Sequence, residues 1–255
     1  MTDISALAGT DHLLVALDFD GTLSPLVDDP MSARMTADAR AALGALLAAP
    51  ATSVALVSGR SLGDLRTIAE HDDASAVLLA GSHGAEYWVP GGGAETIADP
   101  AQLALRDRLR GSAEGFAVSA PGAWIEPKSF GFGVHLRTVA DRAQAETLRA
   151  SVDDLMRVEA ADWRRREGHN LVEYAFRTEG KDAAVAHLRE LTGATAVVFA
   201  GDDVTDEDAL RTLGEHDMGI RVGPGETAAR VRVDDTTELA RLLGDIARER
   251  VAARQ

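Results

Sequence analysis

Short apolar runs alternate with segments of helical spacing along much of the chain. The apolar runs end at or just before Gly, Ser or Asp, and they span residues 13–19, 53–57, 76–80, 196–200 and, more weakly, 218–222. Runs this short, bounded by turn residues, are typical of strands buried on both faces of a parallel sheet. Segments rich in Ala, Leu and Arg with helical spacing lie at 37–49, 61–69, 181–192 and 207–213. The alternation predicts an α/β fold with a doubly wound, Rossmann-like parallel sheet.

The middle of the chain has a different pattern. It predicts a helix at 102–111, strands at 116–119, 124–128 and 130–137, a second helix at 140–157, and strands near 158–164 and 170–176. A loop rich in Pro and Gly, residues 89–100, leads into this α+β region. We therefore expect a discontinuous core domain, residues 1–100 and 178–255, and an inserted α+β domain, residues 101–177.

Composition narrows the functional classes. The 255 residues, 45 % of them apolar, suffice for one large domain with a smaller insert. A net charge of -15 repels nucleic acid and anionic membranes, and the absence of cysteine excludes disulfides and thiolate chemistry. No segment approaches the roughly 18 uninterrupted apolar residues of a membrane-spanning helix, and the first ten residues lack an export-signal pattern. We expect a cytoplasmic protein with no nucleic-acid or membrane partner.

Two acidic clusters follow predicted strands. Asp18 and Asp20 come after the first strand, and Asp202, Asp203 and Asp206 come after the fourth. Ligands of open parallel sheets bind beyond the carboxyl ends of the strands. Carboxylates from separate loops are the hard oxygen donors that Mg²⁺ prefers, with room left for water and a phosphate. A solvated acidic turn at the first cluster and helix N-capping at the second are the alternatives.

Two further positions suit a bound phosphate. Ser58-Gly59-Arg60 follows a predicted strand and precedes a helix, where a hydroxyl and backbone N–H groups make an anion site, although a plain serine N-cap explains it too. Lys181 opens a predicted helix, and with Lys128 it is one of only two lysines among 26 basic residues. Lysine supplies a compact point charge that suits a tight site around one phosphate or an attacking carboxylate.

Taken in order, Asp-x-Asp, Ser, Lys and Gly-Asp-Asp resemble the four motifs of the haloacid dehalogenase-like (HAD) phosphohydrolases. The stretches DFDGTL at 18–23 and GDDVTDED at 201–208, combined with SGR at 58–60 and GSHGAE at 81–86, are similar to the trehalose-6-phosphate phosphatases of that superfamily. The resemblance covers nearly the whole chain. It implies a HAD core whose inserted α+β domain is a cap of the C2 type.

The resemblance also implies roles for core residues. Asp18 is the expected nucleophile, which forms an aspartyl-phosphate, and Asp20 is the expected acid that protonates the leaving oxygen and then activates water. Ser58 and Lys181 complete the expected catalytic set. Mg²⁺ is expected on Asp18, the backbone carbonyl of Asp20 and Asp202, supported by Asp206 or Asp203.

The substrate-binding set implied by the resemblance spans both domains. It comprises Gly21, Thr22, Gly59, Arg60, His83, Glu126, Lys128, His135 and Glu173. Alternation along a strand places Glu126 and Lys128 on one face, and carboxylates that bridge adjacent hydroxyls are the expected sugar contacts. For His135, a solvated strand face is the alternative.

One departure from the family pattern bears on the substrate. The family has Glu-x-x-Pro and then Lys-Gly, whereas this chain has Glu173-Tyr174-Ala175-Phe176 and Lys181-Asp182. We expect a monomeric, Mg²⁺-dependent phosphatase that converts the small molecule trehalose 6-phosphate to trehalose and phosphate. Another glycosyl or cyclitol phosphate, such as a pseudo-disaccharide phosphate, is the first alternative.

Two alternatives belong to other classes. A receiver-type signalling module also uses acidic residues, Mg²⁺ and a lysine, but it has neither an Asp-x-Asp pair nor an insert of this size. An inactive sugar-phosphate sensor of the same fold would have no use for an acid/base such as Asp20 beside Asp18.

Overall fold

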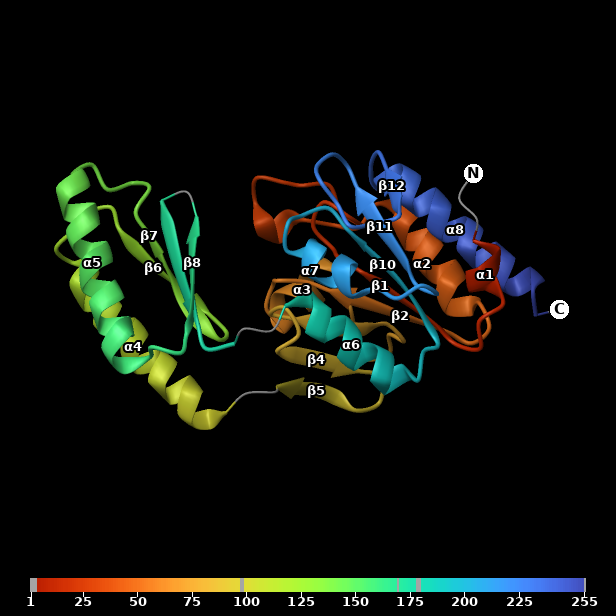
Figure 1. The fold of residues 1–255 in the computed structure, drawn as a ribbon, viewed down its shortest axis with the longest axis horizontal. Helices are drawn as coiled ribbons and strands as arrows, with labels where there is room; N and C mark the ends of the chain where they lie inside the picture. Colours follow the sequence, from red (N-terminus) through yellow and green to blue (C-terminus); the bar gives the residue numbers. More distant parts are fainter. Residues whose placement is uncertain (1–3, 97–98, 169, 178–179, 255) are drawn as a thin grey trace. The chain divides into compact units, whose positions relative to one another are not determined.

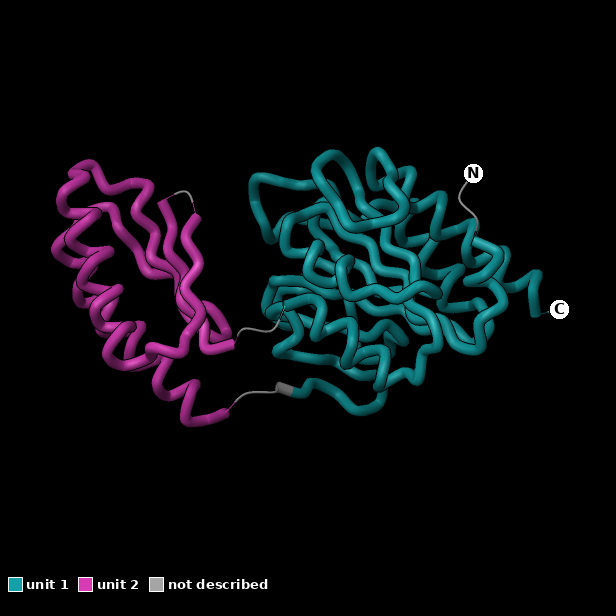
Figure 2. The backbone as a smooth tube through the Cα atoms, in the orientation of Figure 1, with its two compact units in different colours: residues 1–96, 179–255 teal, residues 97–178 magenta. Residues whose placement is uncertain are grey.

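The computed structural model describes residues 4–96, 99–168, 170–177 and 180–254 (Figure 1). The chain forms two compact units (Figure 2). Unit 1 consists of Met1–Thr96 and Glu179–Gln255, and unit 2 consists of Ile97–Thr178. Among the described residues, no helix combines the length and the apolar character needed to cross a membrane.

Unit 1 is built on an eight-stranded sheet with the strand order β12-β11-β10-β1-β2-β3-β4-β5. Its strands are β1 (Leu13–Leu17), β2 (Thr52–Val57), β3 (Leu78–Gly81), β4 (Glu86–Val89), β5 (Gly93–Thr96), β10 (Ala196–Gly201), β11 (Met218–Val222) and β12 (Val231–Val233). Neighbours from β12 to β3 are parallel, and β4 and β5 add an antiparallel edge. The predicted α/β class with a parallel central sheet is confirmed.

Helices cover both faces of this sheet. They are α1 (Ser5–Ala8), α2 (Ala37–Ala48), α3 (Leu62–Ile68), α6 (Lys181–Thr192), α7 (Asp206–Thr212) and α8 (Thr236–Ala252), with a short 3₁₀ turn at Pro30–Ser32. Leu13, Val15 and Leu17 of β1 pack into one core with α2, α3 and α8. The alternate residues Leu14 and Ala16 pack into a second core with α6 and α7. The sequence of a central strand buried on both faces is therefore a continuous apolar run.

Unit 2 is a four-stranded antiparallel sheet backed by two helices. The strand order is β6-β7-β9-β8, with β6 (Trp124–Lys128), β7 (Gly131–His135), β8 (Arg164–Gly168) and β9 (Leu171–Ala175). Helices α4 (Pro100–Ala117) and α5 (Arg142–Glu159) cover one face of the sheet (Figure 1). Phe132, Val134 and Val172 reach the core on that face and meet Leu109 and Val152 of the helices.

Several local expectations were wrong. Residues 116–119 are not a strand, because α4 continues to Ala117 and keeps burying one side chain per turn, Leu109 and then Ala113. The strand expected near 158–164 begins only at Arg164, since α5 runs on to Glu159. Residues 89–100 were expected to be a loop, but the hairpin of β4 and β5 extends into them. Strand β5 was missed because its sequence contains no apolar run. Helix α8 and strand β12 were also not predicted.

Candidate active site

The two acidic clusters lie at the carboxyl ends of adjacent central strands. Strands β1 and β10 pair in parallel, and the N–H of Asp18 donates to the carbonyl of Ala200 at 2.9 Å, which extends the pairing one residue past β1. Asp202 follows the last residue of β10. The parallel register therefore brings residues 184 positions apart in sequence to one edge of the sheet.

Lys181 is buried between two carboxylates. Its Nζ lies 2.7 Å from Oδ1 of Asp18 and 2.6 Å from Oδ1 of Asp206, and all three side chains are buried. Burial raises the pKa of Asp18 to about 7, although the ammonium of Lys181 opposes this shift. Burial opposes the charge of Lys181 as well, but the two carboxylates hold its pKa above the ordinary value. The lysine is therefore a fixed cation beside the Asp18 carboxylate.

Three carboxylates lie close together and offer the oxygen ligands that a hard metal ion prefers. One oxygen from each of Asp18, Asp202 and Asp206 lies within 4.8 Å of the others. Their three formal charges face one ammonium, that of Lys181, so the group has a net charge of two negative units. Burial, and then the neighbouring Asp206, raises the pKa of Asp202. An all-oxygen group with this charge fits a divalent cation such as Mg²⁺.

Within the described part of the chain, two of the expected metal residues contribute no carboxylate to this group. The carboxylate of Asp20 binds Arg60 instead. Oδ1 of Asp203 accepts the N–H of Val204 at 2.7 Å, and the Asp203 N–H donates to Oδ2 of Asp206 at 2.9 Å. Asp203 thus orients Asp206 through its backbone.

The turn after β1 touches Asp202 directly. Gly21 has φ +76°, and a Cβ at this position would lie 2.0 Å from Oδ2 of Asp202. The hydroxyl of Thr22 donates to Oδ1 of Asp202 at 3.2 Å. Glycine is therefore required here both by its backbone conformation and by the close approach of a carboxylate. Thr22, an expected substrate residue, positions Asp202.

The SGR segment at 58–60 meets Asp20. Arg60 donates from Nε to Oδ2 of Asp20 at 2.6 Å and from Nη2 to Oδ1 at 2.7 Å. The hydroxyl of Ser58 is buried and accepts the N–H of Arg60 at 3.2 Å. A Cβ on Gly59 would lie 2.7 Å from the His83 ring, so that ring packs on the bare backbone of this loop.

The GSHGAE segment supports the same loop. The N–H of His83 donates to the carbonyl of Ser58 at 3.0 Å, and the N–H of Ser82 donates to the carbonyl of Arg60 at 2.6 Å. Oε2 of Glu86 accepts the hydroxyl of Ser82 at 2.6 Å and the N–H of Leu62 at 3.0 Å. Leu62 is the first residue of α3, so Glu86 joins the turn after β3 to the start of that helix.

A separate charged cluster lies on the sheet of unit 2. Lys128 on β6 bonds to Oε1 of Glu173 on β9, and its Nζ lies 3.5 Å from Oε2 of Glu126. Nε2 of His135 lies 2.9 Å from the same oxygen of Glu126. All four residues were expected to bind substrate, and the structure brings them together.

Two glycines on the intervening strand β7 make this cluster possible. Gly133 pairs with Glu126 on one side and with Glu173 on the other, and Gly131 pairs with Lys128. Strands β6 and β9 are two strand spacings apart, about 9.6 Å. Because neither glycine places a side chain in the gap, the side chains from the outer strands meet above β7.

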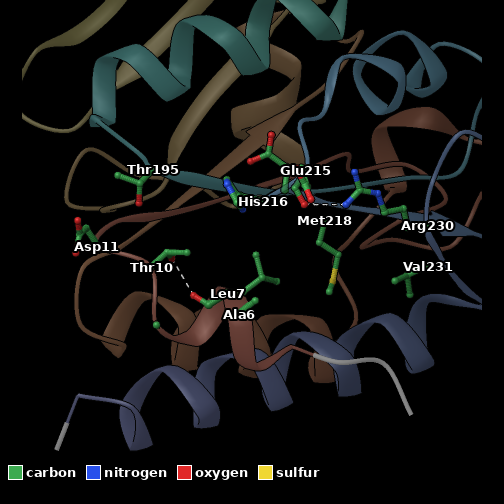
Figure 3. Close-up of a pocket in the computed structure, with 12 residues that line it drawn as sticks. Ala6, Leu7, Thr10, Asp11, Thr195, Glu215, His216, Met218, Arg230 and Val231 are labelled. Atoms are coloured by element: carbon green, nitrogen blue, oxygen red, sulfur yellow. Dashed lines mark hydrogen bonds between the residues drawn. The ribbon is translucent and has the colours of Figure 1, made fainter.

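A cavity of about 510 Å³ lies at the opposite end of the unit 1 strands (Figure 3). Its lining includes Asp11, Thr195 and Asp217, which precede β1, β10 and β11. The expected catalytic and metal-binding residues instead follow β1, β2 and β10 or, in the case of Lys181, begin α6. None of those residues lines this cavity, so the candidate site is the carboxylate group.

Comparisons with known proteins agree with these motifs. A family model described as trehalose-phosphatase matches residues 16–239. The chain belongs to the trehalose-phosphatase family. A trehalose-phosphate phosphatase of Mycobacterium ulcerans is 33 % identical over 96 % of this chain and 65 % of its own length. The chain thus spans slightly less than two thirds of that relative.

Solved structures of two phosphatases share the fold. The trehalose-6-phosphate phosphatase of Aspergillus fumigatus superposes with a TM-score of 0.75 at 22 % identity, covering 97 % of this chain and 98 % of that one. A sugar phosphatase of HAD subclass IIB superposes with a TM-score of 0.58 at 14 % identity, covering 91 % of this chain and 98 % of that one. Both likenesses show a shared fold, an α/β core with an inserted α+β unit.

The departure from the trehalose-phosphatase pattern has a structural counterpart. Phe176 stands where the pattern has proline, and its N–H donates to the carbonyl of Phe130 at 3.0 Å. Proline has no N–H and could not make this bond. The Phe176 ring also packs on Phe130 and Trp163. Asp182, which replaces the glycine, lies in the first turn of α6, where a negative charge is favourable.

Proposed function

We propose that this protein is a Mg²⁺-dependent phosphatase that hydrolyses trehalose 6-phosphate to trehalose and inorganic phosphate. The main support is the buried Lys181 that contacts Asp18 and Asp206 beside Asp202, in a chain of the trehalose-phosphatase family. Buried carboxylates around one fixed cation suit phosphoryl transfer, in which catalysis depends mostly on positioning and charge neutralisation. A cytoplasmic, monomeric enzyme is part of the same proposal.

The proposed reaction has two steps. A carboxylate oxygen of Asp18 attacks phosphorus, the bond from phosphorus to the sugar oxygen breaks, and Asp20 gives that oxygen its proton. Asp20 then takes a proton from water, whose oxygen attacks the aspartyl-phosphate and frees phosphate and Asp18. The hydroxyl of Ser58 donates a hydrogen bond to the phosphoryl oxygens, and the ammonium of Lys181 neutralises their charge.

Asp18, Asp202 and Asp206 are the carboxylates that would hold Mg²⁺, with the backbone carbonyl of Asp20 as a further ligand and Asp203 orienting Asp206. The metal would supply charge neutralisation at the phosphoryl group. Thr22 and Gly21 serve this site by fixing Asp202. Contacts within unit 1 support the roles of the side chains, whereas the role of the Asp20 carbonyl rests on the family resemblance.

Substrate binding is divided between two sets of residues. We assign the phosphate end to the loop of Gly59 and Arg60, supported by His83. We assign the sugar hydroxyls to Glu126, Lys128, His135 and Glu173 on the sheet of unit 2. Carboxylates paired with a lysine offer acceptors and donors close together, as a polyhydroxylated ligand requires.

The test is phosphate release from a substrate panel with Mg²⁺ and with EDTA. The panel holds trehalose 6-phosphate, glucose 6-phosphate, sucrose 6-phosphate and a cyclitol-bearing pseudo-disaccharide phosphate. Mg²⁺-dependent preference for trehalose 6-phosphate supports the proposal. Activity on another member alone would keep the chemistry and change the substrate, an alternative favoured by Phe176 and Asp182. No release from any member would contradict a phosphatase.

A further inference from the structure

Trp124 is an exposed aromatic side chain beside the charged cluster of unit 2. The chain has three tryptophans, of which Trp88 and Trp163 are 8 % and 6 % exposed, whereas Trp124 is 49 % exposed. No step of the proposed reaction uses it. An exposed indole next to convergent polar groups suggests a ligand contact, because tryptophan combines large apolar area with few rotatable bonds.

The position of Trp124 is fixed by the strand that carries it. Trp124, Glu126 and Lys128 alternate along β6, so they share one face of the sheet. The neighbouring strand turns Phe132 and Val134 toward the helices, and Gly131, Gly133 and His135 lie on the opposite face. Trp124 therefore lies on the face with the charged cluster, away from the core of unit 2.

His135 holds the indole in place. Trp124 and His135 are directly opposite each other on β6 and β7. Their rings stack with centroids 3.8 Å apart and planes 8° apart. Because Nε2 of the same imidazole lies 2.9 Å from Oε2 of Glu126, the indole, the imidazole and the carboxylate form one connected unit.

This arrangement suits a pyranose ring. Since the imidazole covers one face of the indole, the exposed half of Trp124 lies on the opposite face and the ring edge. The face of an aromatic ring is negatively polarised. A pyranose presents polarised C–H groups on its faces and hydroxyls at its rim, so an indole face and a carboxylate complement two different parts of the same sugar.

We propose that Trp124 is a sugar-binding residue whose open indole face packs against the C–H groups of a pyranose ring, while Glu126 accepts a hydroxyl of that ring. The inference rests on the proposed function in one respect, namely that the substrate is a sugar phosphate. It does not depend on which sugar that is. His135, which we also assign to the sugar hydroxyls, then supports the indole from behind.

The direct test is fluorescence quenching. Trp88 and Trp163 are buried, so acrylamide quenches mainly Trp124. We expect free trehalose, or another sugar of a panel with maltose, sucrose and a pseudo-disaccharide, to lower the quenching constant saturably, about twofold or more when binding is complete. The Trp124→Phe variant should show no such change. Failure of every sugar to protect the wild-type protein would overturn the inference.

Kinetics separate binding from structure. Trp124→Leu keeps apolar bulk but removes the aromatic face, so KM for the preferred disaccharide phosphate should rise about three- to tenfold. Trp124→Phe should recover part of that loss. The kcat/KM for an aryl phosphate should stay within twofold, and Val158→Ala, a change at another exposed apolar residue of unit 2, should leave the kinetic constants for both substrates unchanged.

The outcomes distinguish this inference from the proposed function. If the wild-type protein hydrolyses a sugar phosphate but Trp124→Leu leaves KM unchanged and sugars give no protection, Trp124 does not bind sugar and the phosphatase proposal stands. If no sugar phosphate is hydrolysed, the proposed function fails, and protection by the free sugars alone decides whether the indole binds sugar.

Discussion

Arg60 holds the carboxylate of Asp20 through two hydrogen bonds of 2.6 and 2.7 Å, one to each oxygen. The pair joins the loop after β2 to the loop after β1, and both side chains are largely buried. Fork-like pairs of this kind are strong and geometrically specific. In the proposed reaction Asp20 must reach the leaving oxygen, so Arg60 has to release it. A phosphate that competes for the guanidinium would provide that release.

Replacing Arg60 tests this relationship. Lysine keeps the charge but cannot form the fork, so Arg60→Lys should lower kcat/KM about ten- to hundredfold for trehalose 6-phosphate and for an aryl phosphate alike. Arg40→Lys, which alters an exposed ion pair with Glu70, is the matched control and should change neither value. An unchanged kcat/KM in Arg60→Lys would show that Asp20 acts without its arginine.

Divalent metal should stabilise the folded protein through the carboxylate group. Binding to the native state alone raises stability by RT ln(1 + [Mg²⁺]/Kd), and each kcal/mol shifts the melting midpoint by about 2–4 °C in a chain of this size. We expect Mg²⁺ to raise Tm over the value in EDTA. Asp202→Asn should lose most of this rise, whereas Asp208→Asn, a nearby acid outside the group, should keep it. Equal rises in both variants would place the metal elsewhere.

Asp217 should make the stability of unit 1 depend on pH. Burial alone would raise its pKa, but bonds from Arg189 and from the N–H groups of Gly214 and Val197 outweigh burial and lower the pKa. A lowered carboxyl pKa contributes stability above the pKa of the unfolded chain, and this stability is lost as pH falls through the folded value.

The variant Asp217→Asn isolates that contribution. It should lower the free energy of unfolding by about 1–3 kcal/mol at pH 7, and the difference from wild type should shrink below about pH 4, near the ordinary aspartate pKa. Denaturant unfolding at a series of pH values measures it, with Asp245→Asn on the exposed face of α8 as the control. A difference that does not vary with pH would refute the assignment.

Gly133 should control how unit 2 binds the sugar. A Cβ there would lie 3.2 Å from Oε2 of Glu126 and 3.2 Å from Cδ1 of Leu171, so Gly133→Ala should displace Glu126 without unfolding the sheet. We expect a higher KM for the disaccharide phosphate and an unchanged kcat/KM for an aryl phosphate. In Gly168→Ala, on the same sheet, the nearest atoms are 3.8 Å away, and both substrates should behave as with wild type. If Gly133→Ala lowered kcat/KM equally for both substrates, Glu126 would not be a sugar-binding residue.

The sequence predicted the strands whose residues are almost all apolar. Strands β1 and β10, and β2 from Val54 onward, are buried on both faces. Their apolar runs are therefore continuous, and Asp18, Asp202 and Ser58 follow them directly. The edge strands β5 and β12 are short and carry polar residues, so no apolar run marks them. These two strands form because they pair with neighbouring strands, and the local sequence pattern holds no information about that pairing.

The contacts within the sites depend on distant parts of the chain. The pair of Arg60 with Asp20 requires the register of β1 against β2. The bond from Lys128 to Glu173 requires glycines at the facing positions of the intervening strand β7. The stacking of Trp124 on His135 follows from the register of β6 and β7. Residue types at fixed spacing therefore indicated the chemistry, whereas the partners of each group became visible only in three dimensions.

The measurement that tests the central claim most directly is phosphate release from trehalose 6-phosphate by the wild-type protein and by Asp18→Asn, each with Mg²⁺ and with EDTA. Circular dichroism of both proteins checks that the fold is retained. We predict release by the wild type only with Mg²⁺, and a loss of at least about a thousandfold in kcat for Asp18→Asn. Comparable release by a folded Asp18→Asn variant would contradict Asp18 as the nucleophile.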